Sequence, residues 1–66
     1  MQIIVNSQPQ NLPEPATIAD LLAVLNLPST RVAIEVNRTL VRRAQHATHQ
    51  LAPGDQVEVV TLVGGG

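Results

Sequence analysis

The sequence predicts an α+β domain in which one main helix packs on one face of a mixed sheet of four or five strands. Three observations support this prediction. β-branched runs lie near both ends, a single stretch between them has the apolar spacing of a helix, and turn residues separate the segments. A chain of 66 residues has room for one domain and not for two. We therefore expect a single hydrophobic core.

The N-terminal segment has the pattern of a β-hairpin. Residues 2–5 (Gln-Ile-Ile-Val) are a β-rich run, residues 6–7 (Asn-Ser) are a turn signal, and residues 9–12 can return as a second, short strand. Two prolines within residues 13–15 then prevent regular strand pairing. We expect the chain to leave the sheet at this point.

The next segment predicts an amphipathic helix that begins at Ile18. Thr17 and Asp20 fit the capping-box pattern, in which each side chain accepts a hydrogen bond from the other residue's backbone N–H. Apolar residues then recur at positions i, i+3, i+4 and i+7, which places them on one face of a helix. They are Ile18, Leu21, Leu22 and Leu25. Asn26 and Pro28 are expected to end the helix.

Three later segments complete the predicted sheet. Residues 31–37 alternate between two faces, and residues 40–41 can form a short strand near them. Residues 44–51 have no clear period, and we expect a short helical or irregular crossover there. After a turn at residues 53–55 (Pro-Gly-Asp), residues 56–63 are the longest β-branched run in the chain.

Strand alternation predicts an apolar patch on the face of the sheet that the helix does not cover. Along the last strand, Val57, Val59 and Thr61 alternate with Glu58, Val60 and Leu62, and Val57 and Val59 point toward the helix. Val60 and Leu62 then point away from the helix, and Ile4 lies next to them if the first and last strands pair. Exposed apolar patches usually mark partner surfaces. We therefore expect Ile4, Val60 and Leu62 to be docking residues.

The composition excludes several classes of protein. The absence of cysteine excludes a disulfide framework, a thiolate zinc site and a cysteine nucleophile. A net charge of −1 and the absence of Phe, Tyr and Trp argue against nucleic-acid binding. No apolar run approaches the roughly 20 residues of a membrane span, and Met1 is not followed by a signal-peptide pattern. We expect a soluble, cytoplasmic protein that is monomeric when free.

The side chains offer neither a catalytic site nor a metal site. His46 and His49 have a metal-ligand spacing, but no third ligand is near them in the sequence, and we interpret them as part of a solvated polar turn. Ser7, with a histidine and Asp55, has the residue types of a hydrolase triad but lies in an ordinary turn. We predict that the chain binds no metal and is not itself an enzyme.

Two groups of charged residues are expected at the surface. Arg38, Arg42 and Arg43 cluster around the fourth strand, and they form either a solvated rim or a docking patch for an acidic groove on a partner. Glu35 and Glu58 have the outward phase of their strands. We interpret these two as surface carboxylates and not as a catalytic acid-base pair.

The last three residues, Gly64, Gly65 and Gly66, predict a function for the terminus. Without Cβ atoms they can adopt positive φ and pass through a channel that is too narrow for side chains. The terminal carboxyl is an anion at neutral pH, and the sequence has no phosphate-binding glycine loop. The alternative interpretation is a frayed terminus without function.

Several features occur together along the chain: the start at residues 1–3 (Met-Gln-Ile), the Thr-capped helix with its Leu-Leu pair, residues 34–37 (Ile-Glu-Val-Asn), residues 51–60 with Pro-Gly-Asp, and the Gly-Gly at residues 65–66. In this combination the chain resembles the thiamine-biosynthesis sulfur carrier proteins over its whole length. The resemblance implies a ubiquitin-like β-grasp fold. It also implies a domain of residues 1–63 followed by a flexible glycine tail of residues 64–66.

The resemblance further implies a carrier role for the C-terminal glycine. Gly66 would be adenylated by a ubiquitin-activating-like enzyme, which uses ATP and Mg, and then converted to a thiocarboxylate. The sulfur would come from a donor such as a cysteine desulfurase and go to a thiazole synthase. Two alternatives stay open, namely the small subunit of a molybdopterin synthase, and a ubiquitin-like modifier or interaction module.

Overall fold

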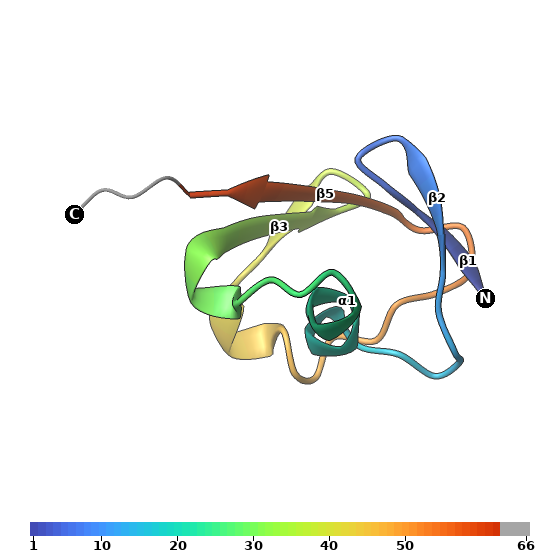
Figure 1. Cartoon of the computed structure of the whole chain (residues 1–66), viewed down its shortest axis with the longest axis horizontal. Coiled ribbons are helices and arrows are strands. Elements are labelled where there is room, and N and C mark those ends of the chain that lie inside the picture. Colours follow the sequence, from blue (N-terminus) through green and yellow to red (C-terminus); the bar gives the residue numbers. More distant parts are fainter. Residues whose placement is uncertain (63–66) are drawn as a thin grey trace.

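The computed structural model, which describes residues 1–62, has one helix against one face of a five-stranded sheet (Figure 1). The strands are β1 (Gln2–Val5), β2 (Gln8–Asn11), β3 (Val32–Val36), β4 (Thr39–Val41) and β5 (Gln56–Thr61). Their order in the sheet is β2-β1-β5-β3-β4, so the last strand in the chain is the central one. β1 and β5 are parallel and the other neighbours are antiparallel, which confirms the predicted mixed sheet.

Helix α1 (Ile18–Val24) begins where the sequence predicts. The Asp20 backbone N–H donates to Thr17 Oγ1 at 3.2 Å, and the Thr17 N–H donates to Asp20 Oδ2 at 2.8 Å, so the capping box is complete. The chain turns out of the helix at Asn26, whose φ of 58° lies in the left-handed region that asparagine tolerates. A short 3₁₀ turn, η1 (Ser29–Arg31), then leads into β3.

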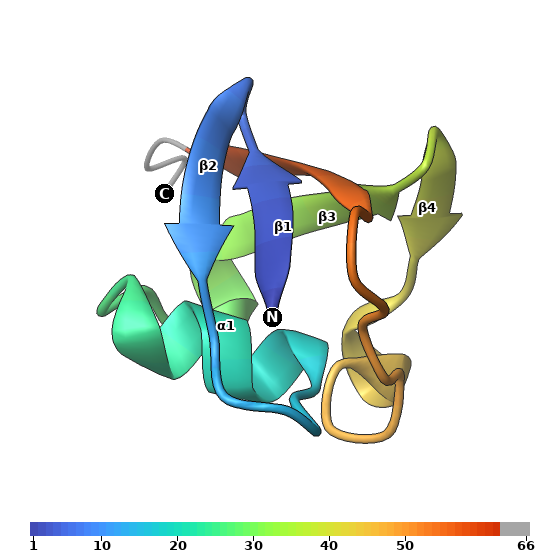
Figure 2. The same ribbon diagram turned by 90° about the vertical axis from the view of Figure 1, so that its right-hand side faces the viewer.

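The hydrophobic core lies between α1 and the face of the sheet that the helix covers (Figure 2). Every second side chain is buried throughout β3, and in β5 as far as Val59. The side chains with the least exposure are Ile3, Ile18, Leu21, Ile34 and Val57. Thr61 shares the phase of Val57 and Val59 but is exposed. The reason is that β1 ends opposite Val57, so the last residues of β5 have a neighbouring strand on one side only.

The crossover between β4 and β5 contains a second 3₁₀ turn, η2 (Arg43–Gln45), followed by a buried histidine. The prediction that His46 lies in a solvated turn is wrong, because its side chain is only 3% exposed. Its Nε2 lies 3.2 Å from the Val41 carbonyl oxygen, and its own carbonyl accepts from the Ala19 N–H at 2.8 Å. His46 therefore contacts the end of β4 through its side chain and the start of α1 through its backbone carbonyl.

Asn6 extends the pairing of β1 with β5 beyond the end of β1. Its backbone has a φ of 49°, which turns the chain back toward β2. Its side chain faces Val59, donating from Nδ2 to the carbonyl at 3.0 Å and accepting from the N–H at Oδ1 at 2.8 Å. A side-chain amide thus replaces the next residue of a strand and holds β5 close to its C-terminal end.

We expect Asn6→Ala to lower the free energy of unfolding by about 2–3 kcal/mol. Two hydrogen bonds worth about 1 kcal/mol each are lost, and alanine pays about 1 kcal/mol for the left-handed backbone. Asn6→Gly is the matched control, because it removes the same hydrogen bonds without the backbone cost. It should lose about 1 kcal/mol less in urea unfolding. If both variants unfold at the same urea concentration as the wild type, the two side-chain hydrogen bonds contribute nothing to stability.

Candidate docking face and C-terminal strand

The candidate site consists of the end of β5 and the sheet face opposite α1, which we call the open face. β5 pairs with β3 from Val57 to Thr61, and the Leu62 N–H continues this ladder by donating to the Arg31 carbonyl at 2.7 Å. On the other side, Asn6 holds Val59. The strand is therefore fixed close to the last described residue. The predictions for Gly64, Gly65 and Gly66 lie outside the described residues.

Large apolar side chains are exposed on the open face near the end of β5. Val60 is 56% exposed and Leu62 is 54% exposed, as the strand alternation predicts. Leu40 on β4 is 64% exposed and was missed by the sequence reasoning. The strand alternation could have identified Leu40, because Val41 faces the core and the residue before it must then face away.

Ile4 shares the open face with Val60 but does not lie next to it. The register places Ile4 beside Gln56 on β5 and beside Pro9 on β2. Val60 is four residues farther along β5, which corresponds to about 13 Å. Ile4 is also only partly exposed. The prediction that these residues are neighbours is wrong, because the short β1 pairs with the beginning of β5 and not with its end.

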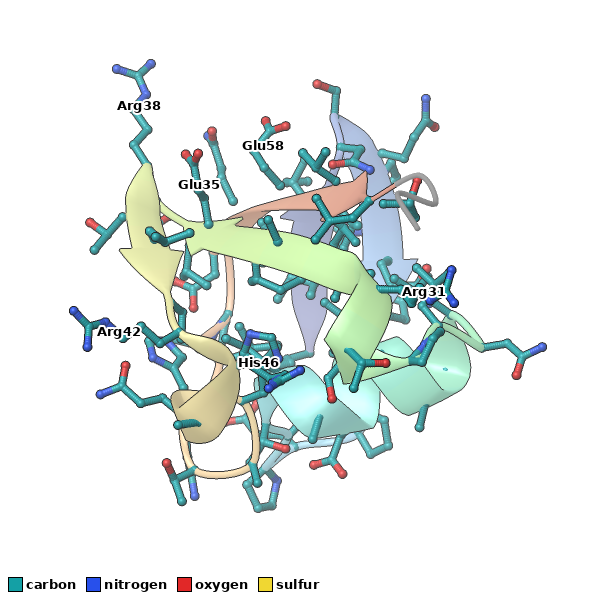
Figure 3. The ribbon with its side chains drawn as sticks, turned by 90° about the vertical axis from the view of Figure 1, so that its left-hand side faces the viewer. Arg31, Glu35, Arg38, Arg42, His46 and Glu58 are labelled. Carbon is teal, nitrogen blue, oxygen red and sulfur yellow. The ribbon has the colours of Figure 1, made fainter. Side chains whose placement is uncertain are left out.

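Arg42 and Arg43 lie in the crossover after β4, outside the open face. Arg42 precedes η2 and Arg43 is its first residue, and both side chains are exposed. Figure 3 shows Arg42 at the side of the sheet, away from the face that carries Glu35 and Glu58. The structure therefore does not join these arginines to the apolar patch, and their docking role stays a prediction.

Two carboxylates lie opposite one another on the open face. Glu35 on β3 pairs directly with Glu58 on β5, and both side chains are exposed, as predicted (Figure 3). Leu40 lies on the other side of Glu35, across the β3–β4 pair. The next pair of β3 and β5 residues on the same face joins Ala33 to Val60. The open face thus has apolar side chains around a pair of like charges.

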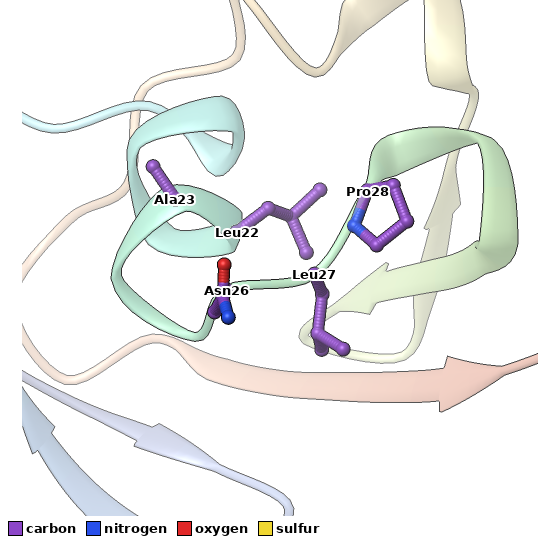
Figure 4. A pocket seen from close by; sticks show the side chains of 5 residues that line it. All are labelled: Leu22, Ala23, Asn26, Leu27 and Pro28. Atoms are coloured by element: carbon purple, nitrogen blue, oxygen red, sulfur yellow. The ribbon is translucent and has the colours of Figure 1, made fainter.

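A shallow depression of about 440 Å³ lies at the end of α1 (Figure 4). The residues that line it are Leu22, Ala23, Asn26, Leu27 and Pro28. None of these side chains ionises, so the depression offers no group for acid-base catalysis. Within residues 1–62, no set of three potential ligand side chains is arranged to hold a metal ion. No helix in the same part of the chain is long and apolar enough to cross a membrane.

Known proteins share both the sequence pattern and the fold. The ThiS family model matches residues 2–66. The uncharacterized protein ycf40 of Porphyra purpurea is 42% identical over 67 residues, covering 100% of this chain and 93% of that protein. The sulfur carrier protein ThiS of Escherichia coli (strain K12) is 32% identical over 66 residues, covering 100% of both. The crystal structure of the thiamine biosynthesis protein (ThiS) from Geobacter metallireducens matches with a TM-score of 0.84 and 28% identity, covering 100% of both chains.

A larger protein contains a similar segment. The thiazole synthase of Paramagnetospirillum magneticum is 32% identical over 66 residues. The match covers 100% of this chain but only 20% of that protein. A segment of this kind therefore also occurs within a longer chain.

Proposed function

The chain belongs to the ThiS family of small sulfur carrier proteins of thiamine biosynthesis, and from this premise we propose that it carries sulfur as a thiocarboxylate on Gly66. The observation that carries the proposal is the central strand β5, paired with β3 and bonded to Asn6 at Val59, and followed in the sequence by Gly64, Gly65 and Gly66. A strand held on both sides near its end can present a side-chain-free terminus to an enzyme while the domain stays folded.

The proposed chemistry has two steps, and a partner enzyme performs both. A carboxylate oxygen of Gly66 attacks the α-phosphorus of ATP, and pyrophosphate leaves with Mg. In the second step the outer sulfur of a persulfide on a donor such as a cysteine desulfurase displaces AMP and forms an acyl disulfide. A thiol then attacks the donor's sulfur, which releases the Gly66 thiocarboxylate and leaves a disulfide between the thiol and the donor. Within residues 1–62 no three potential ligand side chains are arranged to hold a metal ion. In this proposal the ubiquitin-activating-like enzyme binds the ATP and Mg.

The proposed acceptor of the sulfur is a thiazole synthase. The similar segment in the thiazole synthase of Paramagnetospirillum magneticum supports this partner, because a carrier and its acceptor enzyme gain from being joined in one chain. We place the reaction in the cytoplasm, where ATP is available. The open face, with Val60 and Leu62, is the proposed contact with the adenylating enzyme, and Ile4 lies at its far end.

The intact mass of the protein isolated from its own cells tests the carrier role. We expect a species that is heavier by one exchange of oxygen for sulfur, located on Gly66 by fragmentation. Cells that lack the adenylating enzyme are the control and should yield only the unmodified mass. An unmodified terminus in cells that are making thiamine would contradict the proposal.

We expect Gly65→Val to abolish loading while the domain stays as stable as the wild type, within about 0.5 kcal/mol. The ladder between β3 and β5 is complete by Leu62, so the fold does not depend on this position. A β-branched side chain restricts the backbone and widens the segment that enters the enzyme. Gly65→Ala is the graded control and should load slowly. Normal loading of the valine variant would argue against a narrow channel.

A further inference from the structure

Glu35 and Glu58 are directly opposed across the central pair of strands, where they destabilise the free domain. Opposed side chains in an antiparallel pair have Cβ atoms about 5 Å apart, and two like charges at this distance repel each other. Both carboxylates are exposed to solvent. Neither accepts a hydrogen bond in the part of the chain that the structure describes, so the pair has no evident structural use.

The arginines of the chain do not neutralise this pair. Figure 3 shows Arg38 extending away from the turn between β3 and β4, Arg42 at the side of the sheet, and Arg31 at the opposite end of β3. None of the three side chains points toward Glu35 or Glu58. The fourth arginine, Arg43, lies in η2 after β4, outside the open face. The negative charge on the open face therefore lacks a counter-ion from within residues 1–62.

Apolar side chains border the two carboxylates on the same face. Leu40 lies opposite Glu35 and is 64% exposed. Val60, two residues after Glu58 on β5, lies on the same face and is 56% exposed. A partner that covers these apolar groups must also cover the carboxylates, which lie between them. Covering two carboxylates without a cation strongly disfavours binding, so charge complementarity decides which surface can bind here.

We propose that the open face docks on the adenylating enzyme at an apolar surface that carries an arginine, whose guanidinium lies between Glu35 and Glu58. This inference rests on the proposed function and adds the chemistry of the partner's surface. A guanidinium has five N–H donors in one plane and can bond to two carboxylates, and it is weakly hydrated, so it loses less on burial than an ammonium group. The repulsion in the free domain is relieved in the complex, which favours binding further.

The test measures binding and stability of the same variants, because the inference predicts opposite signs. The variants are Glu35→Gln, Glu58→Gln and the two together, titrated calorimetrically into the adenylating enzyme of the same organism at low ionic strength without ATP. We expect each single change to raise Kd about tenfold. The double change should raise Kd by less than a hundredfold, because both carboxylates contact one cation. Removing the repulsion should raise Tm by roughly 1–5 °C.

Glu14→Gln is the matched control, because it makes the same change of charge in an exposed loop outside the open face. Its Kd should stay within about twofold of the wild type, apart from long-range attraction that salt removes. Equal Kd values for Glu14→Gln and the double variant would overturn the inference and leave the carrier function intact. If the wild-type chain does not bind the adenylating enzyme, both the proposed function and the inference fall.

Discussion

A chain extended by one alanine after Gly66 is expected to release no pyrophosphate with the adenylating enzyme and Mg-ATP. In the extended chain the Gly66 carboxylate becomes an amide, which cannot attack phosphorus as an anion. The new carboxylate lies about 3.8 Å farther along the chain, and a shift of that size removes the alignment on which the reaction depends. Pyrophosphate release is measured with a coupled assay, and we expect the rate to fall to background.

Two controls show whether the loss is local. The melting curve of the extended chain should match the wild type, since β5 and its ladder are unchanged. Its Kd for the enzyme should stay similar, because the open face is intact. Equal pyrophosphate release by the extended and native chains would exclude Gly66 as the nucleophile. Pyrophosphate release by the wild-type chain without the enzyme would contradict the carrier role.

The second large effect is expected from aspartate substitutions at two adjacent valines, which face opposite sides of the sheet. Val59 is 8% exposed and faces the core, whereas Val60 is 56% exposed on the open face. Val59→Asp buries a carboxylate without a partner, a cost comparable to the whole stability of a domain of this size, about 5 kcal/mol. We expect this variant to be unfolded by circular dichroism.

Val60→Asp is its matched partner, with the same chemical change one residue later. The new carboxylate stays in water in the free domain, so we expect a loss of stability within roughly 1 kcal/mol. In the complex it replaces an apolar contact, and Kd for the adenylating enzyme should rise at least a hundredfold. A folded Val59→Asp and an unfolded Val60→Asp would reverse the assignment of the two faces.

Local sequence patterns were enough to predict most of the fold. The capping box between Thr17 and Asp20 acts within one turn, so its residues identify the start of α1 without tertiary information. Alternation along β5 assigned Val59 and Val60 to opposite faces, because the two sides of the sheet differ in burial. In both cases the signal and the structure lie within a few residues of each other.

Features that depend on contacts between distant segments could not be predicted in this way. The register of β1 against β5 places Ile4 beside Gln56, and no local pattern encodes it. Asn6 and Val59 are 53 residues apart in the sequence, and a turn asparagine gives no sign that it binds another strand. His46 is a polar residue type, so its sequence context suggested exposure. Its burial depends on the packing of the crossover against β4, where its Nε2 reaches the Val41 carbonyl.

The central position of β5 has a consequence for folding during synthesis on the ribosome. β5 separates the hairpin of β1 and β2 from that of β3 and β4, and these two hairpins do not pair with one another. Until residues 56–61 have been translated, neither hairpin has the strand that completes its sheet, and isolated hairpins are marginal in water. Folding thus awaits the segment next to the glycine tail. A chain whose translation stops before β5 should remain unfolded and open to proteases, and would not compete for the adenylating enzyme.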